Sequence, residues 1–168
     1  MKDKIVIGCD PGEAGYIAVI NLTNKTTTFI HNNLPPYDVY ERLKELERDF
    51  DIVGMGIEKV HAIQGTSAGS NFKFGYNTGA ITALLCTINS SLYEVTPKGW
   101  QNHIGLMLPN GLSPTNRKRR IKKGVGDICS KLYPTAKVRG VRGGLKDGKS
   151  DALMIAHTIM EQHFLNKL

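Results

Sequence analysis

Two apolar runs of this 168-residue chain each end in a carboxylate. Asp10 follows the run Ile5 to Cys9, and Glu58 follows the run Ile52 to Ile57. Such runs are typical of buried strands, and a carboxylate at the end of a buried strand is costly to desolvate unless it is paired or bound to a cation. A third acid, Asp151, precedes another apolar stretch. Any fold of this chain must therefore accommodate several acids at the edge of its core.

The first third of the chain predicts three strands, at residues 4–9, 16–21 and 26–31, separated by short turn signals typical of an antiparallel meander. A helix with Asp38 as its N-cap follows, to about Arg48. Residues 51–57 are almost continuously apolar, which is typical of a central strand, and the strand–helix–strand crossing predicts that it runs parallel to the first strand. With a fifth strand at 91–95, the pattern predicts a single α/β domain over residues 1–168.

Four further helices complete the predicted domain. They are expected from Asn71 or Phe72 to Thr87, at Pro97, from an N-cap at Ser113 to about Leu132, and from Ser150 to about Phe164. For Asp151 to reach Asp10 and Glu58, the last helix must pack across the carboxyl ends of the first and fourth strands.

The net charge of +7 is unevenly distributed. Residues 114–149 contain twelve lysines and arginines but only two acids, Asp127 and Asp147. A block of this kind commonly binds the phosphates of nucleic acid, whereas the structural alternative is a solvated helix face. The acids at the ends of buried strands favour nucleic acid.

Composition also indicates the compartment. The three cysteines, Cys9, Cys86 and Cys129, are odd in number and lack the spacing of a zinc site, which is typical of a reduced intracellular protein. No apolar stretch approaches the ~18 residues of a membrane span, and the N-terminus does not resemble a signal peptide. We expect a cytoplasmic protein without a membrane partner.

Four carboxylates, Asp10, Glu58, Asp147 and Asp151, are the candidate catalytic and metal-binding residues. Like charges raise one another's pKa, and divalent cations remove that conflict. Hard oxygen ligands favour Mg²⁺, with Mn²⁺ as a substitute, and two such ions can promote phosphodiester hydrolysis. Each acid also has a plainer interpretation: Asp10 as a turn residue, Glu58 as a surface strand end, Asp147 as a helix cap, and Asp151 as an acid without a partner.

Five segments, in this order, resemble motifs of the RuvC-type Holliday junction resolvases. They are Ile-Gly-Cys-Asp-Pro-Gly at 7–12, Gly-Ile-Glu-Lys-Val at 56–60, Phe-Gly-Tyr-Asn-Thr-Gly at 74–79, Val-Thr-Pro-Lys at 95–98 with Trp100, and Ser-Asp-Ala-Leu at 150–153. The resemblance implies an RNase H-like fold, a homodimer and Mg²⁺-dependent cleavage of branched DNA, with two ions in each active site. It is strongest to small phage-type members, which implies a role in recombination, repair or phage DNA processing in a prokaryotic or phage-infected cell. The helix from Phe72 to Thr87 is, by resemblance, the dimer candidate.

The chain departs from the family pattern at two positions. Many relatives carry an acid or a histidine three residues before the closing aspartate, where this chain has Gly148, so Asp147 is the nearest candidate for a fourth ligand. Several relatives carry an aromatic residue at the position of His61. The candidate DNA contacts are His61, Lys98, Arg117, Lys118, Arg119, Arg120, Lys122, Lys123 and Lys149.

Other interpretations stay open. Residues 143–150 match the phosphate-binding pattern GxxxxGK[ST], but no apolar strand precedes them, so we expect no nucleotide cofactor. An RNase H-type nuclease acting on RNA–DNA hybrids and a non-catalytic branched-DNA binding protein are the main alternatives for function. A third alternative is a fragment of an actin-like sugar kinase, because Asp-Pro-Gly also occurs in phosphate loops, but 168 residues are too few for the two lobes of that architecture.

Overall fold

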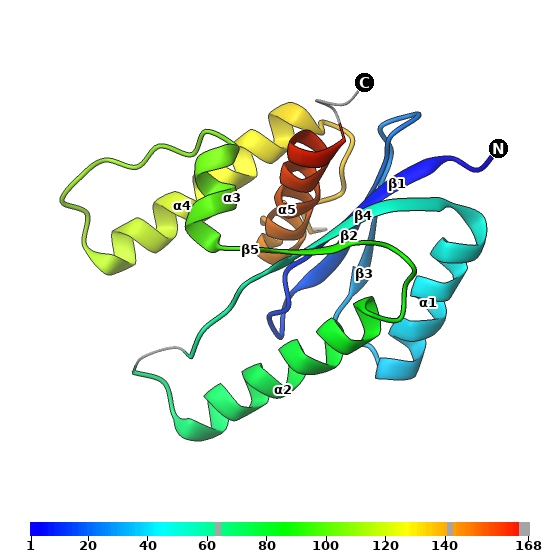
Figure 1. Cartoon of the computed structure of the whole chain (residues 1–168). Coiled ribbons are helices and arrows are strands. Elements are labelled where there is room, and N and C mark those ends of the chain that lie inside the picture. Colours follow the sequence, from blue (N-terminus) through cyan, green and yellow to red (C-terminus); the bar gives the residue numbers. More distant parts are fainter. Residues whose placement is uncertain (63–64, 141–142, 165–168) are drawn as a thin grey trace.

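The computed structural model describes residues 1–62, 65–140 and 143–164, and it places a five-stranded sheet between two layers of helices (Figure 1). The strands are β1 (Lys4–Cys9), β2 (Tyr16–Asn21), β3 (Thr27–His31), β4 (Asp51–Glu58) and β5 (Leu92–Val95). Their order across the sheet is β3-β2-β1-β4-β5. β1, β2 and β3 pair antiparallel, whereas β4 pairs parallel with both β1 and β5. The predicted mixed sheet is therefore confirmed.

Within the described residues, five helices cover the sheet. They are α1 (Pro36–Asp49), α2 (Ala68–Leu85), α3 (Pro97–His103), α4 (Pro114–Leu132) and α5 (Asp147–His163). α1 and α2 cover one face, and α3, α4 and α5 cover the other (Figure 1). Because side chains of a strand alternate between faces, Val6 packs under α5 while Ile5 and Ile7 pack under α1 and α2. The central strand β1 is thus buried on both sides.

The predicted start of α4 is correct, whereas those of α1 and α2 are too late in the sequence. Ser113 caps α4, with Pro114 at its first position, as predicted. The prediction that Asp38 caps α1 is wrong: the helix begins two residues earlier, at Pro36, because proline suits the first helical turn, and Asp38 lies within that turn. α2 begins at Ala68, earlier than predicted, because the Ser67 hydroxyl accepts a hydrogen bond from Ser70 N.

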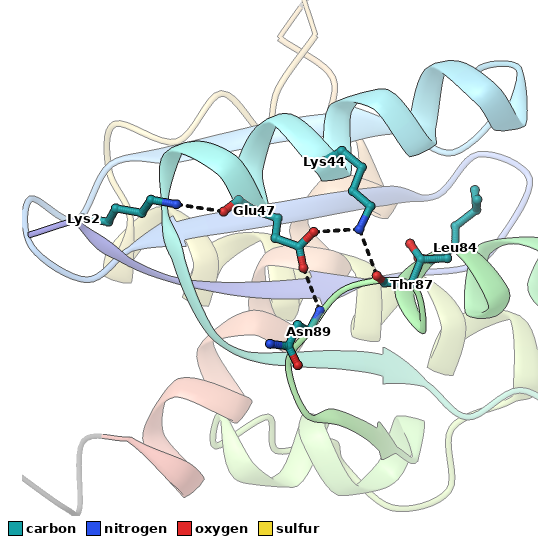
Figure 2. Close-up of polar contacts among 6 residues, drawn as sticks. All are labelled: Lys2, Lys44, Glu47, Leu84, Thr87 and Asn89. Carbon is teal, nitrogen blue, oxygen red and sulfur yellow. Dashed lines mark hydrogen bonds and ion pairs between the residues drawn. The ribbon is translucent and has the colours of Figure 1, made fainter.

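A polar network joins α1 to the connection between α2 and β5 (Figure 2). The Glu47 carboxylate accepts hydrogen bonds from Asn89 N at 2.8 Å and from Lys44 Nζ at 2.7 Å. Lys44 also donates to Thr87 O, and Lys2 donates to Glu47 O. The bonds from Asn89 N and, second, from Lys44 Nζ to the carboxylate lower the pKa of Glu47. The network fixes α1 against the end of α2, at the opposite end of the sheet from Asp10.

Among the helices of the described ranges, none is both long enough and apolar enough to cross a bilayer.

Candidate metal centre and nucleic-acid interface

Asp10 and Glu58 lie at neighbouring positions because β1 and β4 run parallel. Cys9 pairs with Ile57 in the register of the two strands. Asp10 follows Cys9 directly, and Glu58 follows Ile57 as the last residue of β4. The carboxyl ends of parallel strands meet at one edge of a sheet, so the two acids emerge there side by side.

The turn after β1 holds Asp10 by its main chain and by its side chain. Asp10 N donates to Tyr16 O at 3.0 Å, and Asp10 Oδ1 accepts from Gly12 N at 3.1 Å. The Asn32 side-chain amide, at the end of β3, donates to Asp10 O. Burial raises the pKa of Asp10, the bond from Gly12 N opposes that rise, and the charge of Asp147 adds to it.

Asn32 was not among the residues singled out from the sequence. It lies 22 residues from Asp10, and no local pattern connects the two positions. Its Oδ1 atom is buried without a hydrogen-bond partner in the described part of the chain.

Trp100 holds the second acid. Its indole Nε1 donates to Glu58 Oε1 at 2.8 Å. Burial raises the pKa of Glu58, the indole bond opposes that rise, and the charge of Asp10 adds to it. The Thr-Pro segment that begins α3 pointed to Trp100 in the sequence, but nothing there indicated its contact with Glu58.

Asp151 approaches the strand ends from α5, which crosses β1. Burial raises the pKa of Asp151 to about 8, and the charges of Asp10, Glu58 and Asp147 contribute in that order. The charge of Lys122 acts in the opposite direction. Asp10, Glu58 and Asp151 are thus each close enough to another candidate acid for its charge to raise their pKa.

Asp147 is not a helix cap. α5 begins at Asp147 itself, its N-cap residue is Lys146, and no side chain caps the helix. The Asp147 carboxylate instead forms an ion pair with Lys122 of α4. The interpretation of Asp147 as a cap is therefore wrong, because its side chain faces the neighbouring helix.

Packing explains why glycine occupies position 148. A Cβ atom added there would lie 2.4 Å from Ala14 O in the turn between β1 and β2. Real Cβ atoms do not approach a carbonyl oxygen so closely, so an acid at 148 would force the turn or the helix to move. Asp147 is thus the acid that this end of the helix accommodates.

The four carboxylates fit a hard divalent cation in their chemistry. Desolvation and mutual repulsion raise the pKa of Asp10, Glu58 and Asp151, and a bound cation would relieve both costs. In the described ranges, no three carboxylate, imidazole or thiol side chains are already gathered as closely as around a bound metal ion. Gly12 N, Trp100 and Lys122 instead occupy oxygens of Asp10, Glu58 and Asp147.

The first turns of α4 present bases on every side. Residues 113–120 are all exposed, and the first buried side chain of the helix is Val125. In Figure 1 the beginnings of α2 and α4 both extend beyond the sheet on the same side. The predicted contacts Arg117, Lys118, Arg119, Arg120, Lys122 and Lys123 all lie on α4 and are exposed, as are Lys98 and His61 elsewhere.

Several bases of the predicted basic block already have partners within the chain, among them Lys122, which pairs with Asp147, and Arg139, which donates to Gly143 O. Lys123 lies 4.0 Å from Asp127, an exposed pair of low stability. Arg142 lies outside the described residues. The Lys149 ammonium donates to Lys137 O at 3.1 Å and lies over the rings of Tyr16 and Phe29, at 5.2 and 4.9 Å from their centroids. Lys149 thus contacts Lys137, Tyr16 and Phe29 while remaining partly exposed.

Residues 143–150, which match the phosphate-binding pattern, do not directly follow a buried strand of the described chain, as such a loop does. The residues described between α4 and α5 form only an isolated bridge, Arg139 to Leu145, instead of a buried strand. Lys149, the lysine of the pattern, is directed to Tyr16 and Phe29.

The fold matches solved Holliday junction resolvases over nearly its whole length. A Thermus thermophilus RuvC structure in complex with a Holliday junction substrate has 15% sequence identity and a TM-score of 0.55, covering 95% of this chain and 96% of its own. A second RuvC structure from Thermus thermophilus has 17% identity and a TM-score of 0.55, covering 92% of each chain. The yeast mitochondrial Holliday junction resolvase has 12% identity and a TM-score of 0.52, covering 99% of this chain and 83% of its own.

Comparisons by sequence add no relative. No family model matches the chain, and no curated protein matches it. The similarity therefore lies in the fold: the chain has an RNase H-like α/β architecture. More particularly, its fold is that of the RuvC-type resolvases, as the five sequence motifs implied.

Proposed function

We propose that this protein is a structure-selective DNA endonuclease that cleaves four-way junctions and related branched DNA. The observation that supports the proposal is that Asp10 and Glu58 end neighbouring parallel strands and that their charges raise the pKa of Asp151 on α5, while burial raises the pKa of all three acids. Groups with perturbed pKa values that gather from separate elements are typical of functional sites. The fold shared with resolvases supports branched DNA as the proposed substrate class, and recombination or phage DNA processing is the corresponding proposed role.

Asp10, Glu58 and Asp151, together with Asp147, would hold Mg²⁺ or, as a substitute, Mn²⁺, with two ions expected in each site. When bound, such ions polarise the scissile phosphodiester and lower the pKa of the attacking water. The chain's own part is to orient the ligands: Gly12 N and Asn32 fix Asp10, and α5 brings Asp151 to it. Lys122, which is paired with Asp147, would keep a positive charge beside the candidate ligands.

The exposed bases of α4 would bind the DNA backbone. Phosphate contacts position a duplex without reading its sequence, which suits an enzyme that recognises branched shape. The proposed contacts are Arg117, Lys118, Arg119, Arg120, Lys122 and Lys123, with Lys98 and His61 nearer the strand ends. Lys149 is a further proposed contact, because its ammonium donates one hydrogen bond to Lys137 O and has three donors in all.

A homodimer would supply the two active sites that paired cuts require. α2 is the proposed contact. A Cβ added at Gly75 or Gly79 would meet no atom within 4 Å, and Phe72 and Tyr76 are 76% and 67% exposed. An apolar helix face with open glycines suits close packing against a second helix.

The test is a cleavage panel of four-way, three-way, flap, linear and RNA–DNA hybrid substrates, with and without Mg²⁺. We expect paired cuts in the four-way junction, dependent on Mg²⁺, and loss of cleavage but not of binding in Asp10→Asn and Glu58→Gln. Preferential cutting of the hybrid would instead identify an RNase H-type nuclease. Tight junction binding without cleavage, in Mg²⁺ and also in Mn²⁺, would identify a non-catalytic binding protein.

A further inference from the structure

Trp100 is a large, fully buried side chain with one polar atom, and that atom is bonded to a candidate metal ligand. The ring is 1% exposed, and its Nε1 lies 2.8 Å from Glu58 Oε1. An indole has a single donor and no acceptor, and a buried indole N–H requires a partner. Here the partner is a carboxylate, which makes the hydrogen bond charge-assisted and therefore stronger than a neutral one.

The helix that carries Trp100 is fixed at both of its ends. Thr96 Oγ1 accepts a hydrogen bond from Gly99 N at 3.1 Å and caps the start of α3. At the other end, His103 Nε2 lies 3.0 Å from Glu161 Oε2 of α5. The indole is thus held in one position before any ligand binds.

β4, which carries Glu58, pairs with β5, and β5 leads into α3. Glu58 pairs with Val95, the last residue of β5, and Lys59 N donates to Val95 O at 2.7 Å. Only Thr96 separates Val95 from the first residue of α3. The donor and the acceptor of the indole bond therefore belong to one rigid unit, although 42 residues separate them in sequence.

We propose that Trp100 is a positioning residue that sets the orientation of the Glu58 carboxylate, binding Oε1 and leaving Oε2 to the metal ion. This inference rests on the proposed function. Groups that hydrogen-bond to a metal ligand restrict its orientation, and their removal typically weakens metal binding by about 10- to 100-fold. If the indole were purely structural, removing its N–H would lower the stability of the fold and leave metal affinity unchanged.

The chain offers a clean test because Trp100 is its single tryptophan. Incorporation of 3-benzothienylalanine in place of tryptophan changes this position alone, keeping the ring shape while replacing N–H by sulfur. Titration calorimetry with Mn²⁺ should show affinity at least about 10-fold lower than in the wild-type protein, with the Kd for a four-way junction in EDTA unchanged. The control variant Ile159→Val, in the core beside β4, should lower the Tm without changing Mn²⁺ affinity.

A second measurement uses the wild-type protein alone. Mg²⁺ is diamagnetic and does not itself quench indole emission, so a saturable change of Trp100 fluorescence on adding Mg²⁺ would report altered bonding at Glu58. Absence of that change, or equal Mn²⁺ affinity in the isosteric protein, would overturn the role of Trp100 while leaving the nuclease intact. A wild-type protein that binds neither ion and cuts no substrate would overturn the proposed function itself, and the inference with it.

Discussion

Gly8 of β1 and Ala156 of α5 are in backbone contact, with no room for a side chain between them. A Cβ atom added at Gly8 would lie 2.2 Å from Ala156 N and 2.3 Å from Ala152 O. This close approach is what lets α5 lie directly on the central strand, two residues before Asp10. The distance between Asp151 and the strand ends therefore depends on a glycine that carries no chemistry.

Gly8→Ala should destabilise the protein strongly. The clashing atoms belong to the helix backbone and cannot rotate away, so we expect a loss at or above the upper end of the ~1–3 kcal/mol typical of overpacking. Urea unfolding measures it. Gly69→Ala is the control, because nothing lies within 4 Å of a Cβ there, and its effect should stay within about 0.5 kcal/mol. Equal effects of the two substitutions would contradict the packing described.

Asp151→Asn should raise stability in metal-free buffer at pH 8. The folded pKa of Asp151, about 8, lies above the ordinary value near 3.9, so the fold favours the protonated acid. Its contribution to stability is full below about pH 4 and is lost as the pH rises towards 8. Melting curves in EDTA should show a higher Tm for the variant at pH 8 and no gain near pH 4.

Mg²⁺ provides the complementary measurement. It should raise the Tm of the wild-type protein at pH 8 more than that of Asp151→Asn, because the ion removes the repulsion that ionisation creates. A parallel pH dependence for the two proteins would show that Asp151 is not strained by burial.

Replacing Arg117, Lys118, Arg119 and Arg120 by alanine should weaken junction binding and flatten its salt dependence. For every phosphate that the variant no longer neutralises, the slope of log K against log salt should fall by about 0.9. Binding titrations at several salt concentrations measure this slope. The control replaces Arg42 and Arg48 of α1, which are exposed and paired with neighbouring acids, and should leave the slope unchanged. An unaltered slope in the α4 variant would remove this helix from the DNA interface.

Tyr133→Phe should destabilise the protein without affecting the metal centre. The Tyr133 hydroxyl lies 2.9 Å from His157 Nδ1, and both residues are buried. Loss of the hydroxyl leaves a buried ring nitrogen without its partner, which costs about 1–3 kcal/mol. Chemical denaturation measures that loss. Tyr37→Phe, at an exposed position of α1, is the matched control, and junction cleavage should remain near wild type in both.

The buried Tyr133–His157 pair also predicts that the stability of the fold falls at acid pH. Burial lowers the pKa of His157, with Glu161 opposing that effect, so the fold favours the neutral ring. Its contribution to stability is present above the unfolded value of about 6.5 and is lost as the pH falls towards the lower folded value. His157→Gln should reduce this dependence; an unchanged acid profile would exclude His157 as its source.

Gly79→Arg should abolish the proposed dimer while preserving the fold. The position is open in the single chain, so an arginine side chain fits there, but it would separate two helices packed through this face. Light scattering coupled to size exclusion should show a dimer for the wild type and a monomer for the variant, with unchanged circular dichroism. Glu41→Arg on α1 is the control for added charge. A monomeric wild type at all concentrations would contradict the dimer.

Local patterns predicted those parts of the fold that depend on neighbouring residues. The bounds of β1 and β2 and the start of α4 agree with expectation because turn residues, alternation and a capping serine act over a few positions. The cap predicted at Asp38 failed because Pro36 can begin a helix earlier. The helix predicted from Ser150 begins at Asp147 instead, since α5 packs against the turn after β1, which no local pattern reveals.

The amino-acid sequence was enough to predict that acids follow two central strands and that a block of bases lies elsewhere. Parallel pairing of those strands is enough to place Asp10 beside Glu58. Three relationships became visible only in the folded chain: Asp147 pairs with Lys122, Gly148 leaves no room for an acid, and Trp100 donates to Glu58. These relationships join residues that lie far apart in sequence. They depend on the distance between packed helices and strands, and the side-chain volumes of the whole core set that distance.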